Sequence, residues 1–285
     1  MCTSLKAPNM TASSISKHPF AHWLSCTLSP SGIATLTLNR PEKHNAFDDQ
    51  LIQLFITQLQ RLALDTNVRG LIITGAGKSF SAGADLAWMQ RMAAYDEAAN
   101  IADAQQLALL MQLLNEFPKP TLAVVNGAAF GGAVGLIACC DSVISADHVS
   151  FCLSEVRIGL IPAVISPFVM NKVGISWGRH LMTSAKVFTA DQALAMGLVH
   201  EVVAACELEK AKDQWTLGTM DNSPEAVAQI KQLLNRVNSH SPITKESLAS
   251  TTALTTSAIS KIRVSASGQA GLKSFLTKTL APWKQ

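Results

Sequence analysis

The most informative part of the sequence is the stretch Lys78-Ser-Phe-Ser-Ala-Gly-Ala-Asp-Leu86, together with a second glycine-rich stretch further along the chain, Gly127-Ala-Ala-Phe-Gly-Gly132. Each stretch places an accessible backbone amide beside small residues, which leave the main chain open to close approach. Two amides held in place beforehand can donate to one oxygen, and a thioester carbonyl needs such donors as it gains negative charge. The pair therefore predicts an oxyanion hole with room for an acyl chain and a pantetheine arm.

The composition is that of a globular protein. The chain has 285 residues, of which 48% are hydrophobic and 15% charged, enough for one large domain or one domain with an appended helical piece. The net charge is +3 and no Arg/Lys cluster occurs, which argues against nucleic acid as a partner. The apolar stretches fall short of the roughly 20 residues that a membrane span needs. We therefore expect a soluble protein with neither nucleic-acid nor membrane partners.

The cysteines and the first residues bear on the compartment. Six cysteines occur without C-x-x-C spacing, so we expect buried thiols in a reducing compartment, with no metal site and no disulfide framework. Residues 1–19 are interpreted as a flexible tail. This segment is rich in Ser and Thr and has no acidic residue, which leaves an organelle-targeting peptide open. The expected location is the bacterial cytoplasm, with the mitochondrial matrix as the alternative.

Short apolar runs alternate with helical patterns from about residue 24 onward, and this alternation predicts an α/β fold in which helices cover strands. Expected strands cover residues 24–28, 33–38, 68–74, 121–125 and 143–146. Helical patterns cover residues 48–64, 133–140, 191–196, 204–217 and 271–283, and a further helix is expected to open at Asp85. The turn at residues 29–32 predicts a hairpin between the first two strands.

Two more segments complete a recognisable set. They are Asn39-Arg-Pro-Glu-Lys-His-Asn-Ala46 and Ser154-Glu155, which leads to Gly159-Leu-Ile-Pro162. In this order and at these spacings, the segments resemble the crotonase family, also called the enoyl-CoA hydratase and isomerase superfamily, over nearly the whole chain. The resemblance implies a spiral of ββα units, residues 20–205, followed by a C-terminal helical trimerisation region, residues 206–285. It also implies homotrimers that are usually paired into homohexamers.

Carried over residue by residue, the resemblance implies that the amides of Ala84 and Gly132 form the oxyanion hole. It implies that Glu155 carries the proton, and the apolar residues around Glu155 could raise its pKa toward the working pH. The structural alternative for Glu155 is a surface carboxylate paired with Arg157. For the glycine pair, it is close packing of a strand against a helix.

The chain departs from the best-known hydratase pattern at Gly135, where a second glutamate belongs. With one carboxylate, two reactions stay open: addition of water to a 2-enoyl thioester, or isomerisation of a 3-enoyl thioester. A third alternative is a non-catalytic acyl-CoA-binding protein that kept the fold.

A narrower resemblance favours hydration. Residues 127–141 and 151–167 look like bacterial hydratases that act on methylglutaconyl-CoA, or on related branched, carboxylated enoyl thioesters. Those enzymes also carry Gly at the place of Gly135, where a missing side chain would leave room for a branched or longer acyl chain. A second substrate carboxylate calls for a cation, and Arg157, Lys172 and Arg179 remain open candidates.

For the CoA end, the resemblance implies contacts near Ala82 and Leu86, with Lys43 close by, and a C-terminal helix with Phe275 and Lys278 over the nucleotide. Asp85 is also a candidate substrate-binding residue, and it is expected to cap the helix that begins there. Coenzyme A enters only as part of the substrate, and no separate cofactor is expected. The Gly127 turn reads G-x-x-x-G-G rather than the G-x-G-x-x-G of dinucleotide sites.

Overall fold

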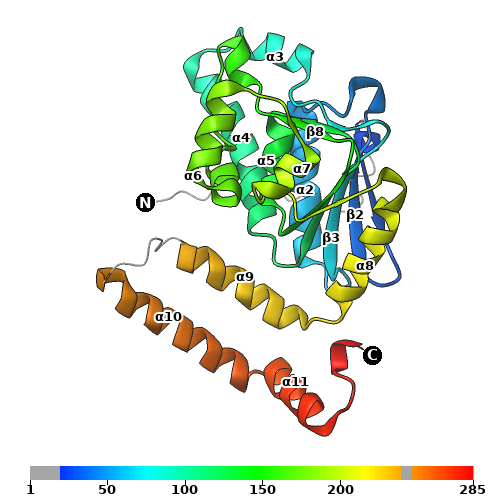
Figure 1. Cartoon of the computed structure of the whole chain (residues 1–285), viewed down its shortest axis with the longest axis vertical. Helices are drawn as coiled ribbons and strands as arrows, with labels where there is room; N and C mark the ends of the chain where they lie inside the picture. Colours follow the sequence, from blue (N-terminus) through cyan, green and yellow to red (C-terminus); the bar gives the residue numbers. More distant parts are fainter. Residues whose placement is uncertain (1–19, 239–244, 285) are drawn as a thin grey trace.

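The computed structural model describes residues 20–238 and 245–284 of the chain (Figure 1); the expected tail, residues 1–19, lies outside them. In this part of the chain one sheet has six strands in the order β1-β2-β3-β5-β7-β10. Only β1 and β2 pair antiparallel, as the predicted hairpin; every other neighbouring pair is parallel. Its strands are β1 (Leu24–Leu28), β2 (Ile33–Leu38), β3 (Gly70–Gly75), β5 (Thr121–Val125), β7 (Ser142–Ala146) and β10 (Glu201–Val203).

A second sheet in the described residues has four short strands in the order β4-β6-β8-β9. The first three are parallel and β9 is antiparallel to β8. They are β4 (Ser79–Ser81), β6 (Ala128–Phe130), β8 (Ser150–Cys152) and β9 (Phe188–Thr189). Three successive units, β3-β4, β5-β6 and β7-β8, each add one strand to each sheet before the helix that follows, whereas β1 and β2 both belong to the six-stranded sheet. This confirms the expected spiral of ββα units.

Helices cover the sheets and enclose the core. Asp48 caps α2 by accepting from Leu51 N, and the side chains that recur at helical spacing, from Leu51 to Leu62, are buried, because one apolar stripe of the helix faces the sheet. The core helices are α2 (Asp49–Leu64), α3 (Leu86–Met92), α4 (Glu97–Asn115), α5 (Gly132–Cys139), α6 (Ser166–Ser184), α7 (Ala190–Ala195) and α8 (Leu208–Met220). Short 3-10 turns are η1 (Ala21–Trp23), η2 (Pro41–Lys43), η3 (Glu155–Ile158), η4 (Ala205–Glu207) and η5 (Pro282–Lys284).

Some predicted boundaries move. The strand expected from residue 68 begins at Gly70, because Val68 N donates to Asp65 O in the turn after α2. The terminal helix expected over residues 271–283 ends at Thr277, since Lys278 adopts a left-handed conformation that closes a helix. The expectation of buried thiols is wrong for Cys206, which is exposed in the turn η4 before α8. Burial raises the pKa of Cys140 to about 12.

Three C-terminal helices, α9 (Pro224–Asn238), α10 (Lys245–Val264) and α11 (Ala266–Thr277), stand apart from the sheets (Figure 1). In contrast, α8 still packs against β7, so the compact body continues past the expected boundary at residue 205. One anchor of the outer helices is Lys231 of α9, which pairs with Asp141. None of the helices in the described ranges is long and apolar enough to cross a membrane.

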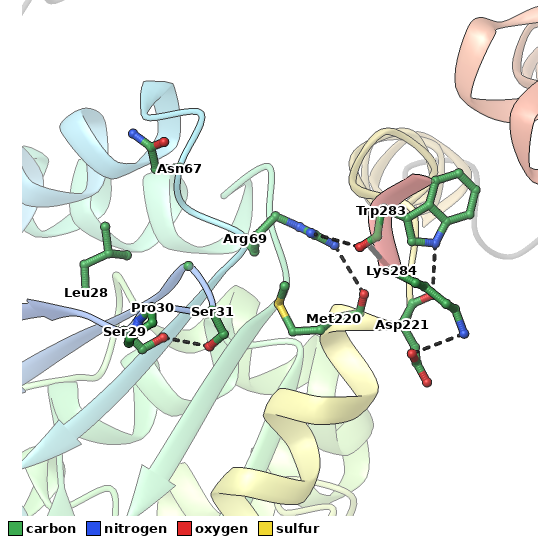
Figure 2. Close-up of a pocket in the computed structure, with 11 residues that line it drawn as sticks. Leu28, Ser29, Pro30, Ser31, Asn67, Arg69, Met220, Asp221, Trp283 and Lys284 are labelled. Carbon is green, nitrogen blue, oxygen red and sulfur yellow. Dashed lines mark hydrogen bonds and ion pairs between the residues drawn. The ribbon is translucent and has the colours of Figure 1, made fainter. Parts of the chain in front are cut away.

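The end of the described chain folds back onto the amino ends of β2 and β3, where a cavity of about 560 Å³ lies (Figure 2). Figure 2 shows Arg69 reaching the carbonyls of Met220 and Trp283, each 3.4 Å away. The indole of Trp283 donates to Asp221 O at 3.1 Å. These bonds tie the turn after α11 to the end of α8.

Candidate active site

Three parallel neighbours of the second sheet, β4, β6 and β8, end at one edge. The loops that leave their carboxyl ends carry Ala84, Gly132 and Glu155. Because the carboxyl ends of parallel strands meet at the same edge, residues far apart in sequence converge there. The sheet topology thus gathers the three predicted catalytic residues.

The loop of Ala84 is held by a single parallel bridge to Phe47. Phe47 N donates to Gly83 O at 2.7 Å, and Asp85 N donates to Phe47 O at 2.7 Å. Since Phe47 bonds to both neighbours of Ala84, the N–H of Ala84 itself points to the other side of the loop. This leaves the amide directed away from the Phe47 segment, as an oxyanion donor requires.

The two amide loops touch through glycines. Gly83 has φ +92° and Gly131 has φ +56°, backbone conformations that L side chains rarely adopt. A Cβ on residue 83 would lie 3.0 Å from Phe130 O and 3.9 Å from Gly131 Cα. The absence of side chains at these two positions is what lets the segments approach each other.

Gly132 is the first residue of α5 and is half-buried. The first N–H groups of a helix have no partner within it, and the aligned peptide dipoles favour negative charge there. The atom nearest to a Cβ placed on Gly132 would be a ring carbon of Phe47, 3.8 Å away. Phe47 therefore packs close to both amide loops.

The carboxylate of Glu155 lies at this junction. Its Oε1 is 3.1 Å from the position that a Cβ on Gly131 would take. Its Oε2 is buried and accepts no hydrogen bond from the described residues. Desolvation by burial raises the pKa of Glu155 above its usual value. Arg157 does not pair with it, because the Arg157 guanidinium donates to Ala185 O.

Gly135 lies one helical turn after Gly132, in the buried part of α5. A Cβ there would meet Ile165 Cγ2 at 2.3 Å and the Met111 methyl at 3.3 Å. The room expected at this position is therefore filled by Ile165 in this chain. Packing of α5 against the start of α6 accounts for the glycine.

The other predicted ligand contacts fall into two groups. Ala82, Ala84 and Leu86 alternate on an exposed face of the loop, next to Lys43, which is half-exposed. Asp85 is buried, and its carboxylate accepts from Ala87 N at 2.8 Å and from Lys43 Nζ at 3.0 Å. We assign Asp85 the capping role, because its oxygens are already engaged by the protein.

Phe275 and Lys278 are not brought to this junction within one chain. Figure 1 places α3, which follows Ala84, and α11 at opposite ends of the long axis. Phe275 is 82% exposed. Of the candidate cations for a substrate carboxylate, Lys172 contacts Asp141 O, at the amino end of β7, and Arg179 is exposed on α6.

The chain is similar to known proteins over most of its length. The model of the enoyl-CoA hydratase/isomerase family matches residues 29–285. The chain belongs to that family. A crystal structure of an enoyl-CoA hydratase from Shewanella pealeana is 42% identical, with a TM-score of 0.87 over 92% of this chain and 96% of that chain.

Two curated relatives of the family extend the comparison. The short-chain-enoyl-CoA hydratase of Clostridium acetobutylicum is 31% identical over 72% of this chain and 78% of its own length. The 2,3-dehydroadipyl-CoA hydratase of Escherichia coli is 33% identical over 72% of this chain and 78% of its own length. Family membership and these names support an enzyme of the hydro-lyase kind.

Sequence reasoning missed two residues of the site and the role of a third. Phe47 and Ile165 carry no chemical group that marks them, and only the packing shows what they contact. Arg40 belongs to the motif at residues 39–46, but the sequence analysis gave it no role. The two aspartates that cap α2 and α3, Asp48 and Asp85, could have indicated that a buried cation lies between them.

Proposed function

We propose that this protein is an enoyl-CoA hydratase that adds water across the 2,3 double bond of a branched or carboxylated enoyl-CoA. The observation that carries the proposal is the position of Glu155: a partly buried carboxylate with one oxygen unpartnered, against the glycine that precedes Gly132. An unpaired buried oxygen with a raised pKa suits a group that exchanges protons with a substrate.

In the proposed reaction, the amides of Ala84 and Gly132 donate to the thioester oxygen. Glu155 removes a proton from water as the water oxygen bonds to C3, and the π electrons move onto the thioester oxygen as an enolate. Collapse of the enolate takes the proton from Glu155 to C2. The carboxylate is regenerated, so one acid serves both steps on the same face.

A single-acid isomerase is the second candidate. The specific observation in its favour is Ile165, whose side chain fills the place of any side chain at residue 135. Without a second carboxylate, Glu155 could remove a proton from C2 of a 3-enoyl thioester and deliver it to C4. The oxyanion hole would hold the same enolate.

The finer substrate class rests on the relatives. The E. coli relative is named for a dehydroadipyl thioester, a substrate with a second carboxylate. Arg157 does not suit the role of cation for this carboxylate, because its guanidinium already donates to Ala185 O. Lys43 is the half-exposed cation beside the amide loop, and we assign it to the CoA end.

We also propose a homotrimer or homohexamer. Phe275 and Leu276 of α11 are exposed, and large exposed apolar side chains mark sites of association. A neighbouring protomer could place its α11, with Phe275 and Lys278, over the CoA nucleotide bound by this chain.

The deciding experiment mixes the purified protein with three thioesters: a linear 2-enoyl-CoA, a linear 3-enoyl-CoA and 3-methylglutaconyl-CoA. Loss of conjugated-enoyl absorbance, with the 3-hydroxy product identified by mass, supports hydration. Gain of that absorbance from the 3-enoyl substrate supports isomerisation. Tight binding with no product in any case would support a non-catalytic acyl-CoA-binding protein and end the proposal.

A further inference from the structure

Arg40 is buried, with 3% of its surface exposed. It joins the Ala84 loop to the segment that contains Phe47. One terminal nitrogen donates to Asp48 Oδ2 at 2.9 Å and to Ala46 O at 3.1 Å. The other donates to Asp85 Oδ2 at 3.0 Å. The guanidinium thus binds residues next to Phe47 and next to Ala84, the two members of the isolated bridge.

Both carboxylates also begin helices. Asp48 Oδ1 accepts from Leu51 N at 2.9 Å at the start of α2, and Asp85 Oδ1 accepts from Ala87 N at the start of α3. Each aspartate thus uses one oxygen for its helix and the other for Arg40. The first turns of two helices and the bridge between them are fixed by one side chain.

Two further contacts fix Arg40 itself. Its guanidinium carbon lies 3.9 Å from the centre of a Trp23 ring, a cation–π contact that orients the plane of the group. Its backbone N–H donates to the side chain of Asn45 at 2.9 Å. Asn45 in turn donates to the carbonyls of Ala76 and Ser79. These bonds reach the strand β4, from which the Ala84 loop departs.

The electrostatics of the cluster fit this arrangement. Burial alone would raise the pKa of Asp85, but hydrogen bonds from Lys43 and Ala87 N, with the charges of Lys43 and Arg40, hold that pKa below its usual value. Arg40 and Lys43 balance Asp48 and Asp85. A lysine at position 40 would keep the charge, but its single ammonium group lacks the planar fork that reaches both carboxylates.

We propose that Arg40 is a positioning residue for the oxyanion hole: it holds the Ala84 N–H in place by binding the carboxylates that cap α2 and α3. Arg40 acts through Asp48 and Asp85. This inference rests on the proposed role of Ala84 and Gly132. If the Arg40 guanidinium is lost, the Ala84 N–H is misdirected. This should lower kcat more than it weakens the binding of a ground-state thioester.

The test uses Arg40→Lys, with Arg61→Lys as the matched control, because Arg61 lies at the far end of α2 and bonds Gln58. The probe is butyryl-CoA labelled with 13C at the thioester carbonyl, whose infrared stretch drops when donors polarise it. In Arg40→Lys we expect kcat to fall about 10- to 100-fold, and the carbonyl stretch to return at least halfway to its value in water. The Kd of butyryl-CoA should stay within about threefold.

The control should retain the wild-type kcat and carbonyl stretch. A folded Arg40→Lys protein with the wild-type stretch, or equal changes in both variants, would overturn the proposal. If Arg40→Lys does not fold, Asp48→Asn decides, since Asn still caps a helix: a wild-type stretch in that variant refutes the role of Arg40, and a shifted one supports it. If the wild-type protein itself leaves the stretch unchanged from water, the oxyanion hole fails, and the inference about Arg40 fails with it.

Discussion

The Glu155 carboxylate has one buried oxygen, Oε2, that accepts no hydrogen bond from the described residues. Ser154 and Glu155 begin a short 3-10 turn that ends at Gly159, where φ is +77°. Arg157 of the same turn is drawn to Ala185 O, which leaves the carboxylate without an ion-pair partner among the described residues. The motif predicted the identity of the residue. Whether its neighbour Arg157 would neutralise it depended on the end of α6, which sequence spacing does not reveal.

Replacing Glu155 by Gln tests this residue directly. We expect Glu155→Gln to lower kcat by about 10²- to 10⁴-fold, because the amide cannot accept and return a proton. The Kd of a saturated acyl-CoA should change little. Glu116→Gln is the matched control, since the exposed Glu116 carboxylate at the end of α4 accepts a hydrogen bond from Gln112. Stopped-flow absorbance of the enoyl group gives kcat, and full turnover by Glu155→Gln would contradict the assignment.

The raised pKa of Glu155 makes a second prediction at this scale. Hydration requires the carboxylate form as base, so kcat/KM should rise as pH increases through the pKa of Glu155. Because desolvation raises that pKa from 4.5, the acid limb of the profile should have its midpoint above pH 4.5. The profile is measured with the wild-type protein in mixed buffers of constant ionic strength. A midpoint at or below the ordinary glutamate value would show that Glu155 is solvated in the working enzyme.

Helices α5 and α6 illustrate the scale of elements. The sequence predicts close approach of the main chain at Gly132, which is the first residue of α5, and room for an acyl chain at Gly135. Gly135 has a different cause: Ile165, at the start of α6, takes the space that a side chain would need. No pattern in the sequence pairs residue 135 with residue 165, because helix packing is a long-range contact.

This packing predicts the outcome of restoring an acid. Gly135→Glu should lower the free energy of unfolding by about 3 kcal/mol or more, because it combines a steric clash with burial of a carboxylate. Pairing it with Ile165→Ala should recover part of that loss, with Ile165→Ala alone as the reference. Urea denaturation of the four proteins gives the coupling free energy. Simple addition of the two single losses would contradict direct contact between the positions.

At the scale of the whole molecule, the C-terminal helices are separated from the site of their own chain. The turn after α11 is tied through Arg69 and Trp283 to the amino ends of the first strands, while the amide loops lie at the carboxyl ends of β4 and β6. The predicted contacts of Phe275 and Lys278 with CoA therefore require a neighbouring protomer.

Association is the simplest consequence to measure. We expect light scattering after size-exclusion chromatography to give a mass of three or six times the 30.4 kDa of one chain. Burial of Phe275 and Leu276 against a neighbour is the physical reason. A monomeric mass at micromolar concentration with full hydratase activity would exclude a shared site.

Lys278 tests the shared site chemically. We expect Lys278→Ala to raise the KM of an enoyl-CoA about tenfold, the loss of one charge-assisted bond to a phosphate. The KM of the matching N-acetylcysteamine thioester, which has no nucleotide, should not change. Lys273→Ala on the same exposed helix is the control and should leave both KM values unaltered. Equal effects on the two substrates would place Lys278 away from the nucleotide.

The amino-acid sequence by itself predicted five strands of the larger sheet, the helices that begin after Asp48 and Asp85, the two glycine stretches and Glu155 as the candidate acid, because local periodicity, turn residues and motif spacing are properties of neighbouring residues. It did not predict β10 or the four strands of the second sheet, since these have only two or three residues each. The tertiary structure decided which of these elements contact one another. Sheet order brings Ala84, Gly132 and Glu155 to one edge, Phe47 turns the Ala84 amide outward, Ile165 fills the space above Gly135, and Arg40 joins two helix starts. Each of these depends on contacts between distant segments, whose geometry is set only when the chain packs.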